Sequence, residues 1–102
     1  MKDATVIEIT TFQLNEGVPA ELLLEAADKM QKEFLAKAGG FISRSLTVEE
    51  NGTWRDIIAW KDKRSMEEAA QRAMEPGAAG PFMGCINFDT VVMKAVEIKA
   101  HY

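Results

Sequence analysis

The chain has 102 residues, 47% of them hydrophobic and 27% charged, a balance typical of one globular domain spanning residues 1–102. Its net charge of −4 argues against a nucleic-acid-binding protein, which needs a clustered basic face to replace phosphate counterions. A single cysteine, Cys85, excludes an intrachain disulfide, and no apolar run approaches the roughly 18 residues of a membrane span. We therefore expect a cytoplasmic protein that binds neither nucleic acid nor a membrane.

The first predicted strand runs from Ala4 to Leu14, where β-branched residues and Phe12 favour a pleated surface. Pro19 then opens a helix, because its fixed φ and missing N–H suit a first turn. Apolar residues recur every three or four positions and form one stripe of an amphipathic helix: Leu23, Ala27, Met30, Phe34 and Ala38. Gly39 is expected to cap this helix in the left-handed conformation.

A β-hairpin is predicted in the middle of the chain. Two runs rich in β-branched and aromatic residues, 41–50 and 53–62, flank the pair Asn51-Gly52. That pair tolerates positive φ at both central positions of a tight turn, which is the strongest short-range signal of a hairpin. Both tryptophans, Trp54 and Trp60, lie on the second strand of this hairpin.

A second helix is predicted from about Met66 to Met74. Ser65 and Glu68 fit a capping box, in which the hydroxyl and the carboxylate each satisfy one free backbone donor. The segment Glu75–Cys85 follows with two prolines and three glycines, which indicate a loop with one helical turn near Phe82.

The last strand is predicted from Ile86 to Ile98, so the element order is β-α-β-β-α-β. With a tight central hairpin and right-handed crossovers, this order predicts a ferredoxin-like α+β fold. The expected sheet has four antiparallel strands in the order 4-1-3-2, with both helices on one face.

Both faces of this sheet are predicted to be apolar. Apolar residues of opposite parity occur on three strands: Ile7 and Ile9 against Val6 and Phe12, Ile57 and Ala59 against Trp54, Ile58 and Trp60, and Val91, Met93 and Ala95 against Phe88, Val92 and Val96. Two helices cover only one face, and the simplest cover for the other is the same face of a second copy. The sequence therefore predicts a homodimer.

Asp56 is the first candidate for chemistry, because it shares a strand face by parity with Trp54 and Trp60. In the functional interpretation the tryptophans form an aromatic wall for a flat ligand, and Asp56 is a base or a hydrogen-bond acceptor. In the alternative, the tryptophans fill the core and Asp56 pairs with Arg44 or Arg55. A carboxylate between apolar residues in mid-strand has to be paired, protonated or hydrated.

Glu8 is the same case on the first strand, which neighbours the third strand in the expected order. Its side chain can then approach Asp56 or Trp54, and two nearby carboxylates would raise the pKa of one and favour a general base. A solvated edge position and a salt bridge across the dimer are the alternatives.

A ligand cavity is expected under the helices, with the segment Glu75–Cys85 as its mobile edge. Phe82 and Met83 are the apolar anchors of that segment, Trp60 is expected in the wall, and Asp56 or Glu8 is expected to be a polar contact. One histidine and one cysteine do not supply a His/Cys metal site, and no phosphate-binding or dinucleotide-binding loop is present. We therefore expect a small hydrophobic ligand and no metal or other cofactor.

The third strand and the residues after it resemble the dimeric α+β barrel superfamily, and within it the antibiotic-biosynthesis-monooxygenase-like domains. The resemblance rests on Asp56-Ile57-Ile58-Ala59-Trp60-Lys61-Asp62, which runs into Ser65-Met66-Glu67-Glu68-Ala69. Members of this family include cofactor-free monooxygenases acting on aromatic polyketides, haem-degrading enzymes and small isomerases. The resemblance implies a homodimer and a pocket between each sheet and its helices.

Two positions bear on which of these activities the resemblance implies. The monooxygenases have an asparagine four residues before the strand tryptophan, and this chain has Asp56 before Trp60, a departure from the pattern for carbanion–oxygen chemistry. The haem degraders need a histidine on or near the second helix, and none occurs between Ser65 and Cys85.

Two function classes remain open. One is a cofactor-free monooxygenase-like or isomerase-like enzyme acting on a small hydrophobic carbonyl or phenolic compound. If it performs oxygen chemistry, its substrate must itself ionise to a carbanion or a phenolate. The other is a non-catalytic homodimer that binds a small ligand or has a structural role.

Overall fold

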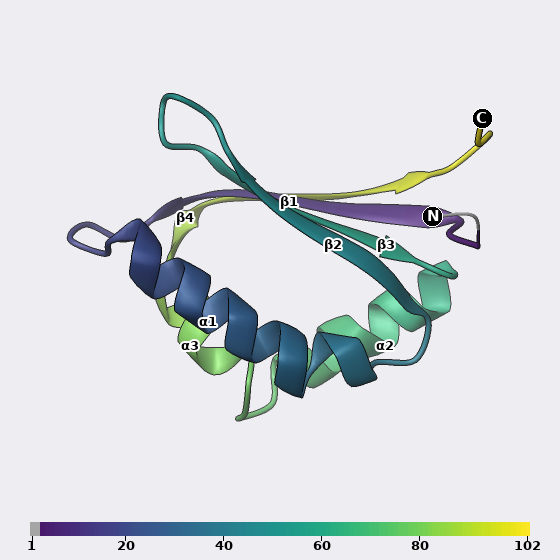
Figure 1. Cartoon of the computed structure of the whole chain (residues 1–102), viewed down its shortest axis with the longest axis horizontal. Coiled ribbons are helices and arrows are strands. Elements are labelled where there is room, and N and C mark those ends of the chain that lie inside the picture. Colours follow the sequence, from purple (N-terminus) through teal and green to yellow (C-terminus); the bar gives the residue numbers. More distant parts are fainter. Residues whose placement is uncertain (1–2) are drawn as a thin grey trace.

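The computed structural model describes residues 3–102, which form a sheet with helices packed on one of its faces (Figure 1). The elements in chain order are β1 (Val6–Leu14), α1 (Ala20–Glu33), the 3-10 helix η1 (Leu35–Lys37), β2 (Phe41–Val48), β3 (Trp54–Trp60), α2 (Lys63–Ala73), α3 (Gly80–Gly84) and β4 (Ile86–Glu97). The strand order is β2-β3-β1-β4 and all three pairings are antiparallel. The predicted ferredoxin-like α+β fold is confirmed.

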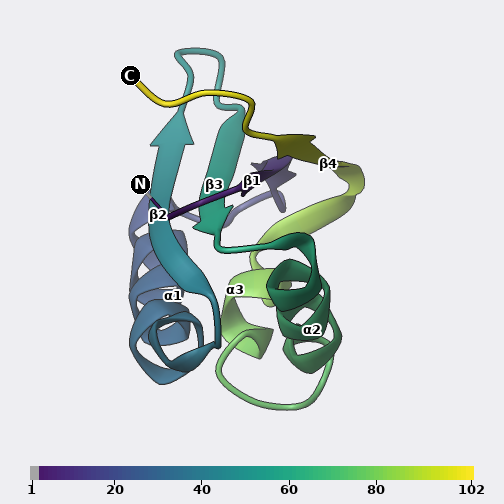
Figure 2. The same cartoon turned by 90° about the vertical axis from the view of Figure 1, so that its right-hand side faces the viewer.

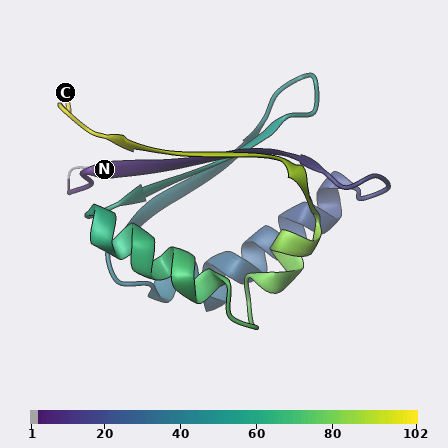
Figure 3. The ribbon, with the colours of Figure 1, turned by 180° about the vertical axis from the view of Figure 1, so that it is seen from behind.

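The helices lie together beneath the sheet and leave its other face bare (Figures 1 and 3). Viewed from the side, α1 lies below β2, and α2 lies below the half of the sheet whose edge strand is β4 (Figure 2). None of the helices within residues 3–102 is long and apolar enough to cross a membrane.

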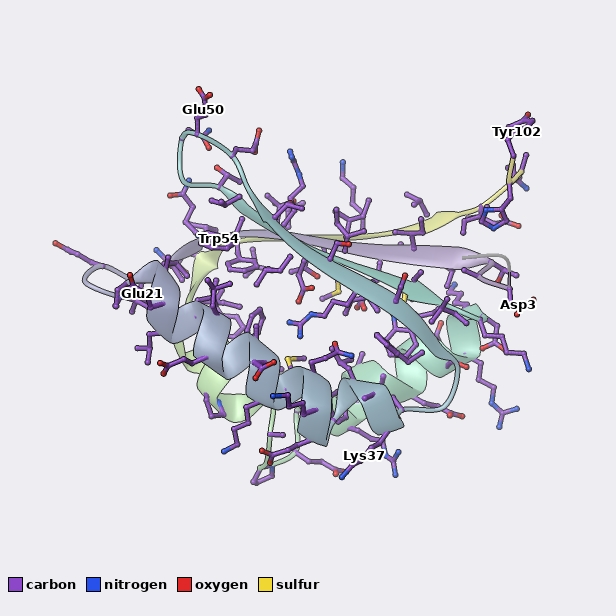
Figure 4. The ribbon with its side chains drawn as sticks, viewed as in Figure 1. Asp3, Glu21, Lys37, Glu50, Trp54 and Tyr102 are labelled. Atoms are coloured by element: carbon purple, nitrogen blue, oxygen red, sulfur yellow. The ribbon has the colours of Figure 1, made fainter. Side chains whose placement is uncertain are left out.

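The core lies between the two layers (Figure 4). The largest side chains that are almost completely buried are Trp60, Phe12, Leu23 and Leu35, which come from β3, β1, α1 and η1. Burying a side chain of this kind stabilises a fold by about 1.5–3 kcal/mol, so these four residues hold the helices against the sheet.

The end of the first helix differs from the prediction. The α-helical stretch ends at Glu33, because Phe34 takes a non-helical backbone conformation (φ −129°, ψ −68°) and a 3-10 turn follows. The left-handed glycine is Gly40 (φ +81°), so the prediction that Gly39 caps the helix was wrong. A Cβ at Gly40 would collide with Ser65, and the Gly40 carbonyl accepts a hydrogen bond from Lys61 N at 2.7 Å, so this position also requires close backbone approach.

The hairpin is confirmed, but its turn is longer than a two-residue loop. The ladder ends at the pair Val48 and Trp54; one step beyond it, Glu49 N donates to Thr53 O at 2.8 Å and Gly52 N donates to Glu49 O at 2.9 Å, so residues 50–52 form the loop that this pair closes. Only Gly52 has a positive φ (+87°), and the Asn51 side chain accepts a hydrogen bond from Thr53 N at 3.0 Å. A three-residue loop ending in a left-handed residue satisfies the strand twist with one positive φ instead of two.

The second helix begins earlier than predicted, and the capping box was wrong. Asp62 is the N-cap, and its Oδ1 accepts a hydrogen bond from Ser65 N at 2.8 Å. Hydrogen bonding by Ser65, through its side chain and then its backbone N–H, lowers the pKa of Asp62. Glu68 forms an ion pair with Arg64 at 3.0 Å instead of reaching back to the helix start. The helical turn expected near Phe82 is confirmed as α3.

Candidate functional site

A cavity of about 400 Å³ lies between the sheet and the helices. Its walls are almost entirely apolar, and the three polar residues that line it are Glu8, Thr10 and Asp56, all on the helix-facing side of the sheet. Its volume falls within the range of small-molecule sites, about 300–1,000 Å³, which also combine apolar walls with few polar groups.

The mouth of this cavity has an apolar rim. Met74, Phe88 and Met93 line the cavity and yet are 79%, 64% and 60% exposed. Met74 directly follows α2 and the other two lie on β4, so the cavity opens to solvent between these elements. Long unbranched methionine side chains adapt to ligands of different shape, which suits a rim.

Phe88 reaches the rim because β4 is irregular near its start. Parity had placed Phe88 on the face of Val92 and Val96, away from Val91 and Met93, and this assignment was wrong. The pairing of β1 with β4 shifts register between Thr11 and Gln13. The shift allows Phe88 to line the same cavity as Val91 and Met93.

Glu8 is held inside the cavity by the adjacent strand. Glu8 lies opposite Ile58 on β3 and is 9% exposed. Trp60 Nε1 donates a hydrogen bond to Glu8 Oε1 at 3.1 Å. Burial raises the pKa of Glu8 above its ordinary value of 4.5; the Trp60 hydrogen bond opposes this rise and the charge of Asp56 adds to it. A carboxylate that binds protons more strongly than usual is suited to act as a general base.

Asp56 forms a buried ion pair with Arg44. Arg44 Nε donates to Oδ1 at 2.8 Å and Arg44 Nη2 donates to Oδ2 at 2.9 Å, and both side chains are less than 10% exposed. Of the two arginines that the sequence left open, Asp56 therefore pairs with Arg44, while Arg55 contacts Glu49 at 3.4 Å. Since each Asp56 oxygen accepts a hydrogen bond from Arg44, this residue affects chemistry in the cavity chiefly through its charge and its support of the fold.

Arg44 also connects the sheet to the helices. Its Nη1 donates to the Ala27 carbonyl oxygen of α1 at 3.1 Å, and its guanidinium lies 5.0 Å from the ring centroid of Phe82 in α3. A bidentate carboxylate pair and a cation–π contact of this kind fix the arginine in one position. The sheet, α1 and α3 are therefore held around the cavity by one side chain.

Five of the six residues that the sequence singled out line this one cavity: Glu8, Asp56, Trp60, Phe82 and Met83. Trp54 does not line it; that side chain is buried in the core at the hairpin end of β3 (Figure 4). Glu8 accordingly contacts Trp60, and Trp54 is not its partner. Sequence reasoning missed Thr10, although its parity with Glu8 placed it on the same face.

A second cleft of about 300 Å³ lies on the outer side of Phe34, which lines both spaces. Acidic and basic side chains both line this cleft: Glu33, Glu75, Lys37 and Arg72. The lining therefore does not favour ligands of one charge. Within residues 3–102, no group of three His, Cys, Asp or Glu side chains is placed to hold a metal ion.

No protein-family model matches this chain, and no curated protein matches it. Solved structures do. SnoaB, a cofactor-independent oxygenase from Streptomyces nogalater, superposes in a mutant form with a TM-score of 0.72 and 19% identity, covering 96% of each chain. The monooxygenase from the gene ActVA-Orf6 of Streptomyces coelicolor, solved with Nanaomycin D, gives a TM-score of 0.69 and 13% identity, covering 100% of this chain and 94% of that one.

A conserved protein from Methanosarcina mazei Go1 is also similar, with a TM-score of 0.71 and 12% identity over 96% of this chain and 97% of that one. The chain shares the fold of these proteins and of two candidate antibiotic biosynthesis monooxygenases, from Bacillus cereus and Chloroflexus aurantiacus J-10-fl. At these identities the likeness is one of architecture, and the resemblance drawn from the third strand is confirmed at that level.

Proposed function

We propose that this protein is a cofactor-independent monooxygenase-like or isomerase-like enzyme that removes a proton from a small hydrophobic carbonyl or phenolic compound. The observation that carries the proposal is Glu8, a carboxyl group with a raised pKa in a largely apolar cavity. The fold adds support, since SnoaB is a cofactor-independent oxygenase.

The geometry supports Glu8 as the base. Trp60 holds Oε1, and within residues 3–102 no side chain or backbone group hydrogen-bonds Oε2, so this second oxygen is left for a ligand. An apolar ligand packs against the walls of the cavity and places its acidic C–H or O–H next to Glu8 Oε2. Because the base lies among apolar side chains, proton transfer proceeds with little competition from water.

The anion formed in this way has two possible fates. In monooxygenation, a CH₂ group next to a carbonyl or an aromatic ring reacts with O₂ to give C=O and water, and the four electrons lost by the carbon are the four that O₂ accepts. In isomerisation, the protonated Glu8 returns its proton to a different carbon, and no oxidant takes part. Both courses begin with the same proton transfer to Glu8.

Glu8→Gln tests the proposal, because glutamine keeps an oxygen that can accept the Trp60 hydrogen bond but removes the base. Over a panel of enolisable aromatic ketones and phenols, we would follow deuterium exchange by NMR and O₂ consumption with an electrode. We expect the variant to lose about 10²–10⁴-fold in rate. Glu25→Gln, an exposed substitution on α1, is the matched control and should retain full activity.

An equal rate in Glu8→Gln and the wild type would contradict the role of Glu8. Tight binding by a wild type that neither exchanges deuterium nor consumes O₂ would contradict the enzyme proposal and favour the alternative, a non-catalytic ligand-binding protein.

A further inference from the structure

Thr10 is the one polar residue of the cavity that still lacks a role. It lies two residues after Glu8 on β1, opposite Asp56 on β3 and Met93 on β4. Its hydroxyl makes no hydrogen bond within the described part of the chain, residues 3–102. Among these residues the fully buried side-chain atom without a hydrogen-bond partner is Gln31 Oε1. The unbonded Thr10 hydroxyl is therefore not fully buried, and its residue lines the cavity.

The carboxylate beside Thr10 does not hold this hydroxyl. Both oxygens of Asp56 receive hydrogen bonds from Arg44, which also balances its charge. A threonine hydroxyl provides one donor and two acceptor sites. In this cavity, therefore, two groups are free to contact a ligand through hydrogen bonds: Glu8 Oε2 and Thr10 Oγ1.

We propose that the Thr10 hydroxyl binds the substrate oxygen on which negative charge develops while Glu8 removes the proton. This inference rests on the proposed function, and it narrows the substrates to compounds in which the oxygen that becomes negatively charged either carries the acidic proton itself or is the carbonyl oxygen next to the carbon that carries it. In a phenol, the oxygen that loses its proton to Glu8 is the one that Thr10 binds. In an enolisable ketone, Thr10 binds the carbonyl oxygen, which is two bonds away from the α-carbon bearing the acidic hydrogen.

The spacing of the two residues fits this arrangement. The Cα atoms of residues i and i+2 on one face of a strand lie about 6.5–7 Å apart, and the two oxygens of an O–H···O hydrogen bond lie about 2.7–2.8 Å apart. A phenol oxygen that contacts both groups needs Thr10 Oγ1 and Glu8 Oε2 within about 5.5 Å of each other, and this backbone spacing allows that once the two side chains incline toward the ligand. Because a hydrogen bond strengthens as its acceptor becomes anionic, Thr10 stabilises the transition state more than the bound substrate.

A structural role for Thr10 makes a different prediction. Threonine favours strands whatever its hydroxyl contacts, and the adjacent Thr11 occupies the opposite, helix-free face of β1. Thr10→Val keeps the branched shape and removes only the hydroxyl, and Thr10→Ser keeps the hydroxyl. Thr11→Val makes the same chemical change outside the cavity and is the matched control.

The test measures binding of 4-nitrophenol and of nitrobenzene, which lacks the phenol oxygen, to the full chain by calorimetry. We expect Thr10→Val to weaken 4-nitrophenol binding about five- to tenfold, the effect of one lost hydrogen bond, and nitrobenzene binding by less than about twofold. The absorbance of bound nitrophenolate should also fall at a fixed pH, because the anion loses a donor. Thr10→Ser should restore both signals, and Thr11→Val should match the wild type.

Equal losses for the two compounds in Thr10→Val, or no loss for either, would overturn the role of Thr10 and leave that of Glu8 standing. If Thr10→Val behaves as expected while Glu8→Gln retains full turnover, the assignment of the base fails alone. A wild type that binds neither compound would overturn both. Thermal unfolding followed by circular dichroism verifies that each variant is folded.

Discussion

The hydrogen bond from Trp60 Nε1 to Glu8 Oε1 tunes the base. Because this bond favours the ionised form, it lowers the pKa of Glu8 against the rise caused by burial. A base is active when deprotonated, so the rate should increase as pH rises through that pKa. Trp60→Phe removes the N–H donor, which raises the pKa of Glu8 further and moves the profile to higher pH.

The pH dependence of kcat/KM checks this shift, since it reports ionisation in the free enzyme. Trp54→Phe is the matched control, the same change in a buried tryptophan that does not line the cavity, and its profile should coincide with that of the wild type. An identical shift in both variants would show that general loosening of the core, and not the hydrogen bond, sets the pKa.

Parity along two strands was enough to place Glu8, Asp56 and Trp60 on one face, because side chains alternate with a period of two. It was not enough to assign their partners. Asp56 had two candidate arginines, and the choice of Arg44 depends on the register of β2 against β3, where Arg44 lies opposite Ile58. The availability of Thr10 likewise depends on which hydroxyls find partners, which only the packed structure decides.

At the scale of elements, the Arg44–Asp56 pair is the connection that binds β2, β3, α1 and α3. Arg44→Met leaves the Asp56 carboxylate buried without its partner, and we expect a loss of about 3–5 kcal/mol in the free energy of unfolding. The double variant Arg44→Met/Asp56→Leu removes both charges and should recover much of this loss. Urea denaturation at neutral pH measures both variants.

Arg64→Met is the control for this experiment. It breaks the Arg64–Glu68 pair on the surface of α2, where both side chains are largely exposed, and should change stability little. A loss in Arg44→Met as small as that in the control would show that the buried pair does not hold the elements together.

Element types and order were predictable because each has its own periodicity, but element ends were not. Asp62 and Ser65 both have side chains that cap helices, and the local sequence favours either. In the structure Asp62 is the N-cap, and Ser65 lies inside the first turn and packs directly against Gly40. Helix ends are therefore set by contacts between distant segments, here the start of the hairpin and the start of α2.

For the whole molecule, the unexplained feature is the face of the sheet that no helix covers (Figure 1). Apolar side chains lie on this face on three adjacent strands: Ile7, Ile9, Ile57, Ala59, Val92 and Val96. Ile9 on β1 and Ile57 on β3 are directly paired. Val92 and Val96 are 52% and 42% exposed. We propose that a second copy covers this face, since an apolar sheet face in contact with water is unfavourable and a two-fold axis makes it self-complementary.

Light scattering after size-exclusion chromatography at micromolar concentration should therefore give about twice the chain mass of 11.3 kDa. Ile9→Arg places a second positive charge beside Lys94, which lies opposite Ile9 on β4, and should give a folded monomer, because two like charges are costly to bury between two sheets. Leu24→Arg replaces an exposed leucine of α1 and should remain dimeric. A monomeric wild type, or dissociation in both variants, would contradict assembly through the sheet. Since the cavity lies on the opposite side of the sheet, Ile9→Arg should still bind 4-nitrophenol, which separates assembly from ligand binding.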